Sequence, residues 1–453
     1  MDNIQQDLSQ FISGCHYDRI DDRFILDIKY RVIDWLGCAM SGVHYAQSCI
    51  ARQFFSQLNG REEATMIGIP GKYPALNAAM VNGIIGHVSE LDDGHRKAIG
   101  HPGSVTLPVA LALGEKLNVS GRGFLKALIL GYDLFIRMGL AVNPSHYATW
   151  HTTGTCGAFA ATATAASLMC LTPEQTCHAL GIVATLASGT QESFGTHAKA
   201  LTVGHACQNG ICAASLAQQG FTGSASAITG KKGFIASTCT KANLEILRNP
   251  GEATLLSDTA FYKVYASCGH TNSPLDAMFT LLKQHTLCPA DIDQIIVETY
   301  RVAVDITGEL KSRTEDEAKF SLPYCISVAI LFGQVSLRQF RSDVLHNHEV
   351  NALAARVRVI ESPVATARFP ARQASVSVYL KNGTHYEVQV MDASDSVVTG
   401  QIEQKFRGAT CELNLQETES VLCYLRNMED QENITPLIRY LALPGRYQAS
   451  IPV

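Results

Sequence analysis

The sequence predicts a mainly α-helical protein with a smaller α+β domain. Up to about residue 255, alanine, glycine, leucine and isoleucine recur at helical spacing, with little alternation of β-branched residues. Strand-like runs begin near residue 291, and a polar, helix-favouring pattern returns after about residue 395. The chain has 453 residues, more than one hydrophobic core usually holds. We therefore expect a helical domain over residues 1–259, an α+β domain over 260–395, and a segment over 396–453 that returns to the helical domain.

The best-marked helix signal lies at residues 173–188. Thr172 is a good N-cap, and Gln175 completes a capping box with it. Pro173 suits the first helical turn, and Gly189 can end the helix. Both ends of this helix are therefore predicted from local sequence.

Other helices are predicted from composition and spacing. Residues 157–170 contain six alanines and should form a buried helix that neighbouring helices approach closely. Residues 411–428 carry the polar, helix-favouring pattern of the C-terminal segment. Within the α+β domain, residues 274–287 and 324–332 also have helical character.

Four runs in the α+β domain have the character of β-strands. They are residues 295–300, 356–360, 374–380 and 385–390. Asn382 and Gly383 separate the last two runs, and an Asn-Gly pair between alternating runs is a strong hairpin signal.

Composition excludes several classes of partner. Lysine plus arginine number 36 and aspartate plus glutamate 41, without a long run of either sign, so no nucleic-acid-binding surface is expected. Polar residues, glycine or proline interrupt every apolar stretch before it could cross a bilayer. The first residues lack the basic and apolar regions of a signal peptide. We therefore expect a cytoplasmic protein with no membrane partner.

The 14 cysteines are scattered, and no two form a C-x-x-C pair. The closest pair, Cys207 and Cys212, lacks the additional ligands of a zinc or iron–sulfur site. In a reducing compartment these residues are expected to be small buried hydrophobes, and no metal is predicted.

The most unusual segment is residues 86–104, GHVSELDDGHRKAIGHPGS. It holds three histidines, three carboxylates and two basic residues between apolar helices. If its first half is helical, His87, Glu90 and Gly94 share a face with Asp93 beside them. His101 precedes a proline and should have extended backbone, with the next helix beginning at Pro108. Histidines and carboxylates would then lie near helix ends, where anions are favoured.

This segment resembles the MmgE/PrpD family pattern of an acidic helix end followed by a His-Pro loop. Six motifs along nearly the whole chain follow the order of that family, although each alone is weakly specific. These six, apart from the segment above, are DWLGCAMSG at 34–42, WHTTGTCG at 150–157, AKA at 198–200, GKKGF at 230–234, KVYASCGH at 263–270 and FSLPY at 320–324.

The resemblance implies a fold, an assembly and a site. Members include 2-methylcitrate dehydratase, cis-aconitate decarboxylase and iminodisuccinate epimerase, and they share a helical domain made from both chain ends, a smaller α+β lid and a homodimer. An active site between helical domain and lid is implied. Its expected catalytic residues are His101, His151, Lys199, Lys263 and Tyr324, with Glu90 at the acidic position.

The chain departs from the decarboxylase-like pattern in the acidic segment. Those members carry Asp with Thr four residues later, whereas this chain has Glu90 and Gly94, and one additional residue precedes His101. Asp93 and His95 are therefore kept as alternative residues that bind or orient the substrate, and the substrate of no single member is transferred.

The residue types suit chemistry at a carbon beside a carboxylate. When a proton leaves that carbon, negative charge accumulates, and a site without a metal must stabilise it with fixed cations and donors. The histidines and lysines of the expected site supply bases and cations. Tyr324 can donate a proton or hydrogen bond, and Glu90 or Asp93 can orient a histidine tautomer.

Structural explanations compete with each assignment. His87, His197, His205 and His270 are expected to be satisfied structural histidines. From the sequence alone, Lys199 would be interpreted as a solvated lysine after a glycine-bearing loop, and Lys263 would be interpreted in the same way. Only the family resemblance favours a catalytic role for them.

Two further motifs suggest other chemistry. Cys268 lies in a Ser-Cys-Gly-His motif that invites a nucleophile, but no nearby motif signals thiolate activation, so a packed or substrate-lining thiol is expected. The GKKG run at 230–233 lacks Walker-A spacing and is expected to be a turn. No G-x-G-x-x-G follows a strand, so a dinucleotide is not expected.

The sequence and the resemblance together predict a cofactor-independent lyase, a dehydratase or decarboxylase, acting on a small polycarboxylic acid. An epimerase or isomerase of a similar acid is the alternative. A non-catalytic polycarboxylate-binding protein is a second alternative, which the candidate bases disfavour because plain binding needs none.

Overall fold

The computed structural model describes residues 3–310, 312–393, 399–410 and 415–442. The chain forms two compact units. The helical unit consists of Met1–Tyr262 and Val397–Val453, and the α+β unit consists of Lys263–Ser396. The fold is therefore mainly helical with one small sheet, as the sequence predicts. The boundary expected at 395/396 lies outside the described residues.

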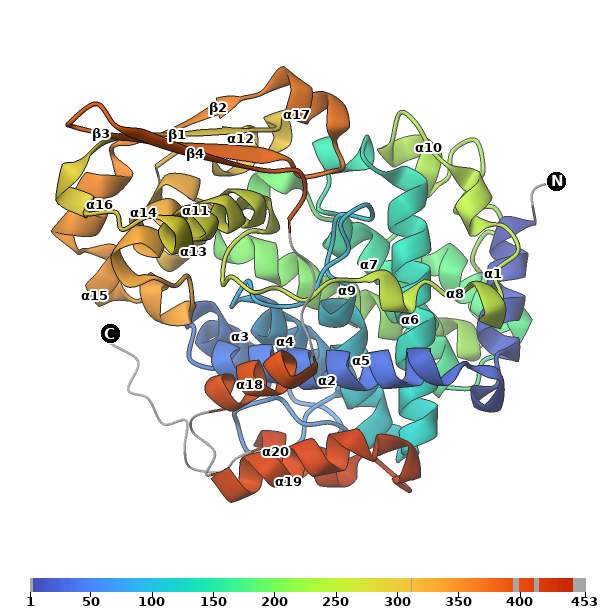
Figure 1. The fold of residues 1–453 in the computed structure, drawn as a ribbon. Helices are drawn as coiled ribbons and strands as arrows, with labels where there is room; N and C mark the ends of the chain where they lie inside the picture. Colours follow the sequence, from blue (N-terminus) through green and yellow to red (C-terminus); the bar gives the residue numbers. More distant parts are fainter. Residues whose placement is uncertain (1–2, 311, 394–398, 411–414, 443–453) are drawn as a thin grey trace. The chain divides into compact units, whose positions relative to one another are not determined.

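The helical unit is built from antiparallel and crossing helices (Figure 1). None of the described helices is long and apolar enough to span a bilayer. Its N-terminal helices are α1 (Ile4–Gly14), α2 (Asp22–Gly42), α3 (Ala46–Ser56), α4 (Ala75–His87), α5 (Pro102–Leu117), α6 (Gly121–Val142), α7 (Thr152–Leu168), α8 (Pro173–Val183), α9 (His197–Gln218) and α10 (Phe234–Thr238).

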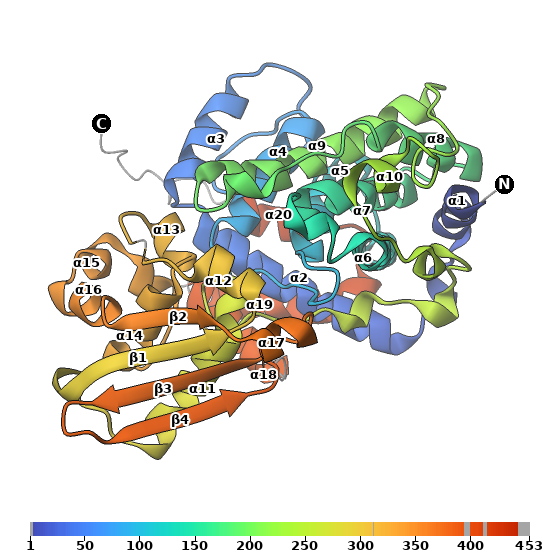
Figure 2. The ribbon, with the colours of Figure 1, turned by 90° about the horizontal axis from the view of Figure 1, so that it is seen from above.

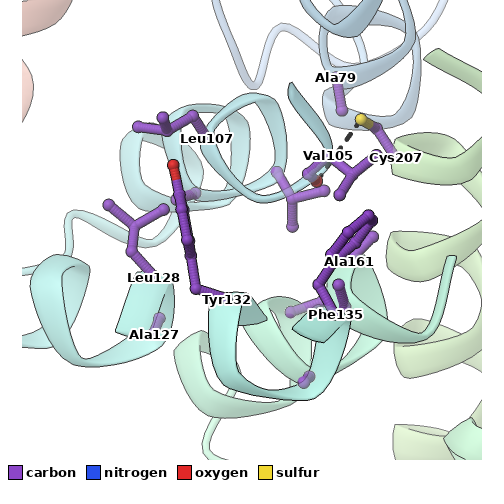
Figure 3. Packing of buried hydrophobic residues seen from close by; sticks show 14 of the residues in the cluster. Ala79, Val105, Leu107, Ala127, Leu128, Tyr132, Phe135, Ala161 and Cys207 are labelled. Atoms are coloured by element: carbon purple, nitrogen blue, oxygen red, sulfur yellow. Dashed lines mark hydrogen bonds between the residues drawn. The ribbon is translucent and has the colours of Figure 1, made fainter. Parts of the chain in front are cut away.

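Helix α7 lies at the centre of this unit, and every one of its residues is buried. It contacts α5, α6, α8 and α9, so it must be apolar on all sides, and its alanines allow the close approach predicted for residues 157–170. Figure 3 shows part of this core, where Phe135 from α6 and Ala161 from α7 lie beside Val105 from α5. The core therefore gives rigid support to the ends of these helices.

The capping box predicted for α8 is confirmed, because Thr172 and Gln175 exchange side-chain-to-backbone hydrogen bonds. The predicted end of α8 is wrong. The helix stops at Val183, where the hydroxyl and backbone N–H of Thr185 both bond the carbonyl of Ile182. These local bonds tighten the chain into a turn, and Gly189, with φ of 134°, comes later in the loop.

The C-terminal segment packs on the N-terminal helices of the same unit. Its helices are α18 (Thr399–Ala409), α19 (Leu415–Arg426) and α20 (Thr435–Ala442). Helices α18 and α19 contact α2, and α20 contacts α5. Lys405 of α18 forms an ion pair with Asp34 of α2 at 2.7 Å and also donates to the carbonyl of Leu91. Residues 411–414 of the helix predicted at 411–428 lie outside the described residues.

The α+β unit contains a four-stranded mixed sheet with the order β2-β1-β3-β4 (Figure 2). Helices α11 and α14 pack against its strands. The strands are β1 (Ile292–Thr299), β2 (Val357–Glu361), β3 (Ala374–Leu380) and β4 (His385–Val390). The helices are α11 (Asn272–Gln284), α12 (Arg301–Thr307), α13 (Glu315–Lys319), α14 (Leu322–Phe332), α15 (Ser342–Leu345), α16 (His348–Ala354) and α17 (Pro363–Arg368).

The predicted hairpin is confirmed. β3 and β4 pair in antiparallel register from Ala374 opposite Val390 to Tyr379 opposite His385, and Gly383 in the turn has φ of 86°. Strand β1 pairs with β2 in parallel and with β3 in antiparallel. The Asn-Gly turn thus sets the register, as its left-handed backbone requires.

Candidate functional site

The site lies where α4 ends and α9 begins. These helices approach closely because Gly83 and Gly204 have no side chains at the contact. A Cβ added at Gly83 would lie only 2.9 Å from the Gly204 Cα and would force the helices apart. The contact places His87, the last residue of α4, beside Lys199 in the first turn of α9. Close helix packing therefore assembles the centre of the site.

The acidic segment after α4 is not helical, and the predicted helical face shared by His87, Glu90 and Gly94 is wrong. Glu90 has φ of 55°, a left-handed conformation that is strained for a residue with a side chain. Gly94 forms a β-bridge with Phe261 instead of continuing the helix. The tight turn after His87 brings Glu90 back toward α9, which helical spacing would not do.

The next helix begins at Pro102, not at the predicted Pro108, which lies inside α5. Pro102 is the first residue of α5, where its missing N–H costs nothing. His101 therefore occupies the N-cap position, and its backbone N–H donates to the hydroxyl of Thr153. The helix end holds His101 in place.

Lys199 is buried in α9, so the solvated-loop interpretation of this residue is wrong. Its ammonium donates to Nε2 of His87 at 2.8 Å and forms an ion pair with the Glu90 carboxylate. The ring of Phe194 lies 5.5 Å from the ammonium, a distance that suits a cation–π contact. The cation is thus in contact with an anion, an imidazole and an aromatic face.

His87 is orientated by Asp92. The carboxylate oxygen Oδ2 of Asp92 lies 2.7 Å from Nδ1 of His87 and accepts a hydrogen bond from Ser104 at 2.6 Å. A carboxylate accepts, so Nδ1 of His87 carries the proton and Nε2 carries the lone pair that faces Lys199. The tautomer of His87 is therefore set by Asp92.

His101 has the same tautomer for a similar reason. Its Nδ1 lies 2.7 Å from the backbone carbonyl oxygen of Asp93, which can only accept, so Nδ1 donates. The Asp92 carboxylate lies 3.3 Å from the same nitrogen. Nε2 of His101 therefore carries the lone pair that a general base needs.

Asp93 holds His101 and the start of α5 in place. Its carboxylate pairs with Arg31 at 3.2 Å and accepts from the backbone N–H of Gly103. Burial raises the pKa of Asp93 to about 6, against the opposing effect of Arg31. Asp93 thus links the segment before α5 to α2 through its side chain and orients His101 through its carbonyl.

His151 is a neutral base candidate at the N-cap of α7. The hydroxyl of Thr202 donates to the carbonyl of Lys199 at 2.8 Å, so its oxygen accepts the Nδ1 proton of His151, also at 2.8 Å. Burial, reinforced by the nearby charge of Lys199, holds the pKa of His151 well below its usual value. This imidazole is therefore uncharged at neutral pH, with its lone pair on Nε2.

Three imidazoles lie close together, and that of His87 contacts the Lys199 ammonium. The ring centroid of His87 lies 4.9 Å from that of His101 and 6.0 Å from that of His151. All three rings carry their proton on Nδ1, as the hydrogen bonds assign it. Such a site can bind an anion at Lys199 and accept a proton from a neighbouring carbon at His101 or His151.

The other predicted residues are His95 in the helical unit and three residues of the α+β unit. His95 uses Nδ1 to accept from Ala98 and Nε2 to bond Thr259, so the structure does not bring its ring nitrogens to this cluster. Lys263, Cys268 and Tyr324 belong to the α+β unit. The Tyr324 hydroxyl donates to the carbonyl of Gln339 in that unit at 2.6 Å.

One group among the described residues has the spacing to hold a cation. His87, Asp92 and His101 each place a ligand atom within 4.8 Å of the others. Nδ1 of His87 and Nδ1 of His101 lie 2.7 Å and 3.3 Å from Oδ2 of Asp92, and Ser104 donates to the same oxygen. We therefore interpret this group as linked by hydrogen bonds.

His87, Asp92 and Thr202 belong to the site but were not among its predicted residues. His87 and Asp92 lie in the segment singled out for its histidines and carboxylates, so their residue types were a usable signal. Their hydrogen bond was not predicted, because residues five apart do not share a face of the expected helix. Thr202 follows Lys199 by three residues at helical spacing, and no motif marked it.

Two buried neutral histidines should make the protein sensitive to acid. Burial lowers the pKa of His146 to about 4, and that of His151 also falls well below 6.5. The unfolded chain takes up these protons below pH 6.5 while the folded chain does not, so stability is complete above that pH and declines below it. Each such histidine should cost roughly 1 kcal/mol between pH 7.5 and 5.5. In His146→Gln, urea unfolding should show a smaller loss of stability over this range than in the parent, and an equal loss would contradict the assignment.

Comparison with protein-family models identifies the family of this chain. The family model described as MmgE/PrpD N-terminal domain matches residues 6–247, and the MmgE/PrpD C-terminal domain matches residues 265–421. The chain belongs to the MmgE/PrpD family.

The curated relatives include decarboxylases and dehydratases. Cis-aconitate decarboxylase of Homo sapiens is 26% identical, covering 98% of this chain and 95% of that protein. Cis-aconitate decarboxylase of Aspergillus terreus (strain NIH 2624 / FGSC A1156) is 25% identical, with 97% and 96% covered. 2-Methylcitrate dehydratase of Escherichia coli O157:H7 is 22% identical, but the match covers only 43% of this chain and 42% of that protein.

Proposed function

We propose that this protein is a cofactor-independent lyase that removes carbon dioxide or water from a small polycarboxylic acid of the aconitate or citrate type. One observation carries the proposal: the Lys199 ammonium is held beside imidazoles whose protons are fixed on Nδ1. The ammonium supplies charge for a substrate carboxylate, and the imidazoles supply lone pairs for a carbon-bound proton.

The site suits the charge that develops in such a reaction. Loss of carbon dioxide or of a proton leaves an electron pair on the carbon beside a remaining carboxylate. Lys199 is fixed and buried, so its attraction for a developing negative charge is screened less than it would be in water. In dehydration His101 would take the carbon-bound proton, and Tyr324 would give a proton to the departing hydroxide to form water. In decarboxylation His101 would first take up a proton from solvent at Nε2 and would then give it to the carbon that carbon dioxide leaves.

The relatives support a lyase. Decarboxylases match nearly the full length of the chain, whereas the dehydratases match less than half, so decarboxylation is our first expectation. Lys263, Tyr324 and Cys268 are included in the proposal as contributors from the α+β unit, with Tyr324 as a proton or hydrogen-bond donor. We also propose a cytoplasmic homodimer, which light scattering after gel filtration would test.

An epimerase is the second candidate, and a specific observation favours it. Inversion at carbon needs one group to remove a proton and another to return it, and both His101 and His151 carry their lone pair on Nε2. In this case the substrate would keep its mass and change its configuration.

The test is incubation in heavy water followed by proton NMR. Citrate, 2-methylcitrate, the aconitates and iminodisuccinate stereoisomers are each supplied to the enzyme. A lyase gives a new alkene or carbon dioxide, and an epimerase gives deuterated substrate of inverted configuration. Tight binding of one acid with neither turnover nor exchange would replace both proposals with a polycarboxylate-binding protein.

Activity should survive removal of metals. Because the charge-stabilising groups are side chains of the protein itself, exhaustive chelation should leave turnover within about twofold of the untreated enzyme. The measurement is turnover before and after chelation, with metal content determined in parallel. Loss of activity that one added metal restores would show that His87, Asp92 and His101 do hold an ion.

A further inference from the structure

We propose that Asp92 and His87 form a positioning dyad that directs the Lys199 ammonium and lets it release and regain a proton during turnover. This inference rests on the proposed function of the site. It assigns a role to two residues that neither the sequence motifs nor the family resemblance marked.

The first step is the direction of the hydrogen bonds. Ser104 donates to Oδ2 of Asp92 at 2.6 Å, and Nδ1 of His87 reaches the same oxygen at 2.7 Å. With its proton on Nδ1, His87 can only accept at Nε2, where the Lys199 ammonium lies 2.8 Å away. Lys199, His87 and Asp92 therefore form a hydrogen-bonded series. Lys199 donates to His87, and His87 donates to Asp92.

The second step is the proton transfer that this hydrogen-bonded series permits. All three residues are buried, so bulk water is a poor route for the Lys199 proton. If Lys199 gives a proton to His87, the imidazolium that forms lies against the Asp92 carboxylate, which stabilises it. The nitrogen of Lys199 then has a lone pair, and the reverse transfer restores the ammonium. No bond other than N–H changes, and no co-reactant is required.

The third step is the direction of the ammonium. A lysine side chain rotates about several bonds, but Lys199 is held on one side by His87 and on another by Glu90. When a substrate carboxylate competes with Glu90, the bond to His87 still limits where the ammonium can point. His87 is thus a positioning residue that acts through Lys199.

Substitution of Asp92 tests the tautomer separately from the fold. In Asp92→Asn the amide can donate to Nδ1, which moves the imidazole proton to Nε2. Nε2 then cannot accept the hydrogen bond from the Lys199 ammonium. We expect turnover to fall at least about 100-fold while KM changes by less than about threefold. Ser104→Ala is the matched control, because it removes the other donor to the same oxygen and leaves the tautomer unchanged; its turnover should fall by less than about tenfold.

A double-mutant cycle decides whether Asp92 acts through His87. His87→Gln alone should lower turnover by about the same factor as Asp92→Asn, and the double variant should be no worse than His87→Gln. Losses that multiply in the double variant would overturn the dyad. Thermal unfolding of each variant identifies any loss that comes from misfolding.

A readout without substrate separates this inference from the proposed function. Nitrogen-15 NMR of the full chain, with the His87 signals identified by their absence in His87→Gln, should show the Nδ1–H tautomer in the parent and the Nε2–H tautomer in Asp92→Asn. If the tautomers are as expected but no acid turns over, the proposed function fails while the dyad geometry stands. If His87 carries its proton on Nε2 in the parent, the dyad is wrong whatever the substrate.

Discussion

Lys199→Met should lower turnover by at least about 100-fold, because it removes the buried cation that stabilises the developing charge. The same substitution should also destabilise the fold, since it leaves the Glu90 carboxylate buried without its cation, a change that costs roughly 3 kcal/mol. Turnover is measured on the acid identified by the heavy-water experiment, and stability by thermal unfolding.

The two effects can be separated with a second substitution. Lys199→Met combined with Glu90→Gln removes both charges, so stability should recover while turnover stays low. Lys231→Met is the matched control, because Lys231 is exposed in the turn at 230–233 and its loss should leave turnover unchanged. Near-normal turnover in Lys199→Met would exclude this lysine from the chemistry.

His101→Gln should lower turnover by at least about 100-fold with little change in KM, because an amide cannot accept a proton from carbon. The glutamine retains an amide N–H that can donate to the carbonyl of Asp93, as Nδ1 of His101 does. The measurement is the rate of deuterium exchange at carbon in heavy water. His16→Gln, at an exposed histidine of the helical unit, is the control and should exchange at the parent rate.

The outcome also distinguishes the two imidazole bases. If exchange persists in His101→Gln and disappears in His151→Gln, the base is His151 and His101 is a binding residue. For an epimerase, either substitution should abolish inversion while exchange from one configuration survives, because each imidazole then serves one face of the carbon.

Features with complete local signals were predicted correctly at the residues that carry those signals. The capping box at Thr172 and Gln175, and the hairpin about Asn382 and Gly383, depend on residues within a few positions of one another. The end of α8 was predicted five residues too late, because hydrogen bonds of Thr185 outweighed the glycine signal at Gly189. Helix ends without a decisive local signal are set by competing bonds of this kind.

The sequence by itself determined the helical class, the hairpin, and the presence of Lys199, His101 and His151 in motifs of one family. Only the tertiary structure decided the burial, charge and tautomer of these side chains. The close approach of α4 and α9 made Lys199 a buried ammonium paired with Glu90, and the left-handed turn at Glu90 placed His87 against Asp92. Tautomers and charges depend on partners far apart in the chain, such as Lys199 and His87, and local patterns contain no information on which distant groups will meet.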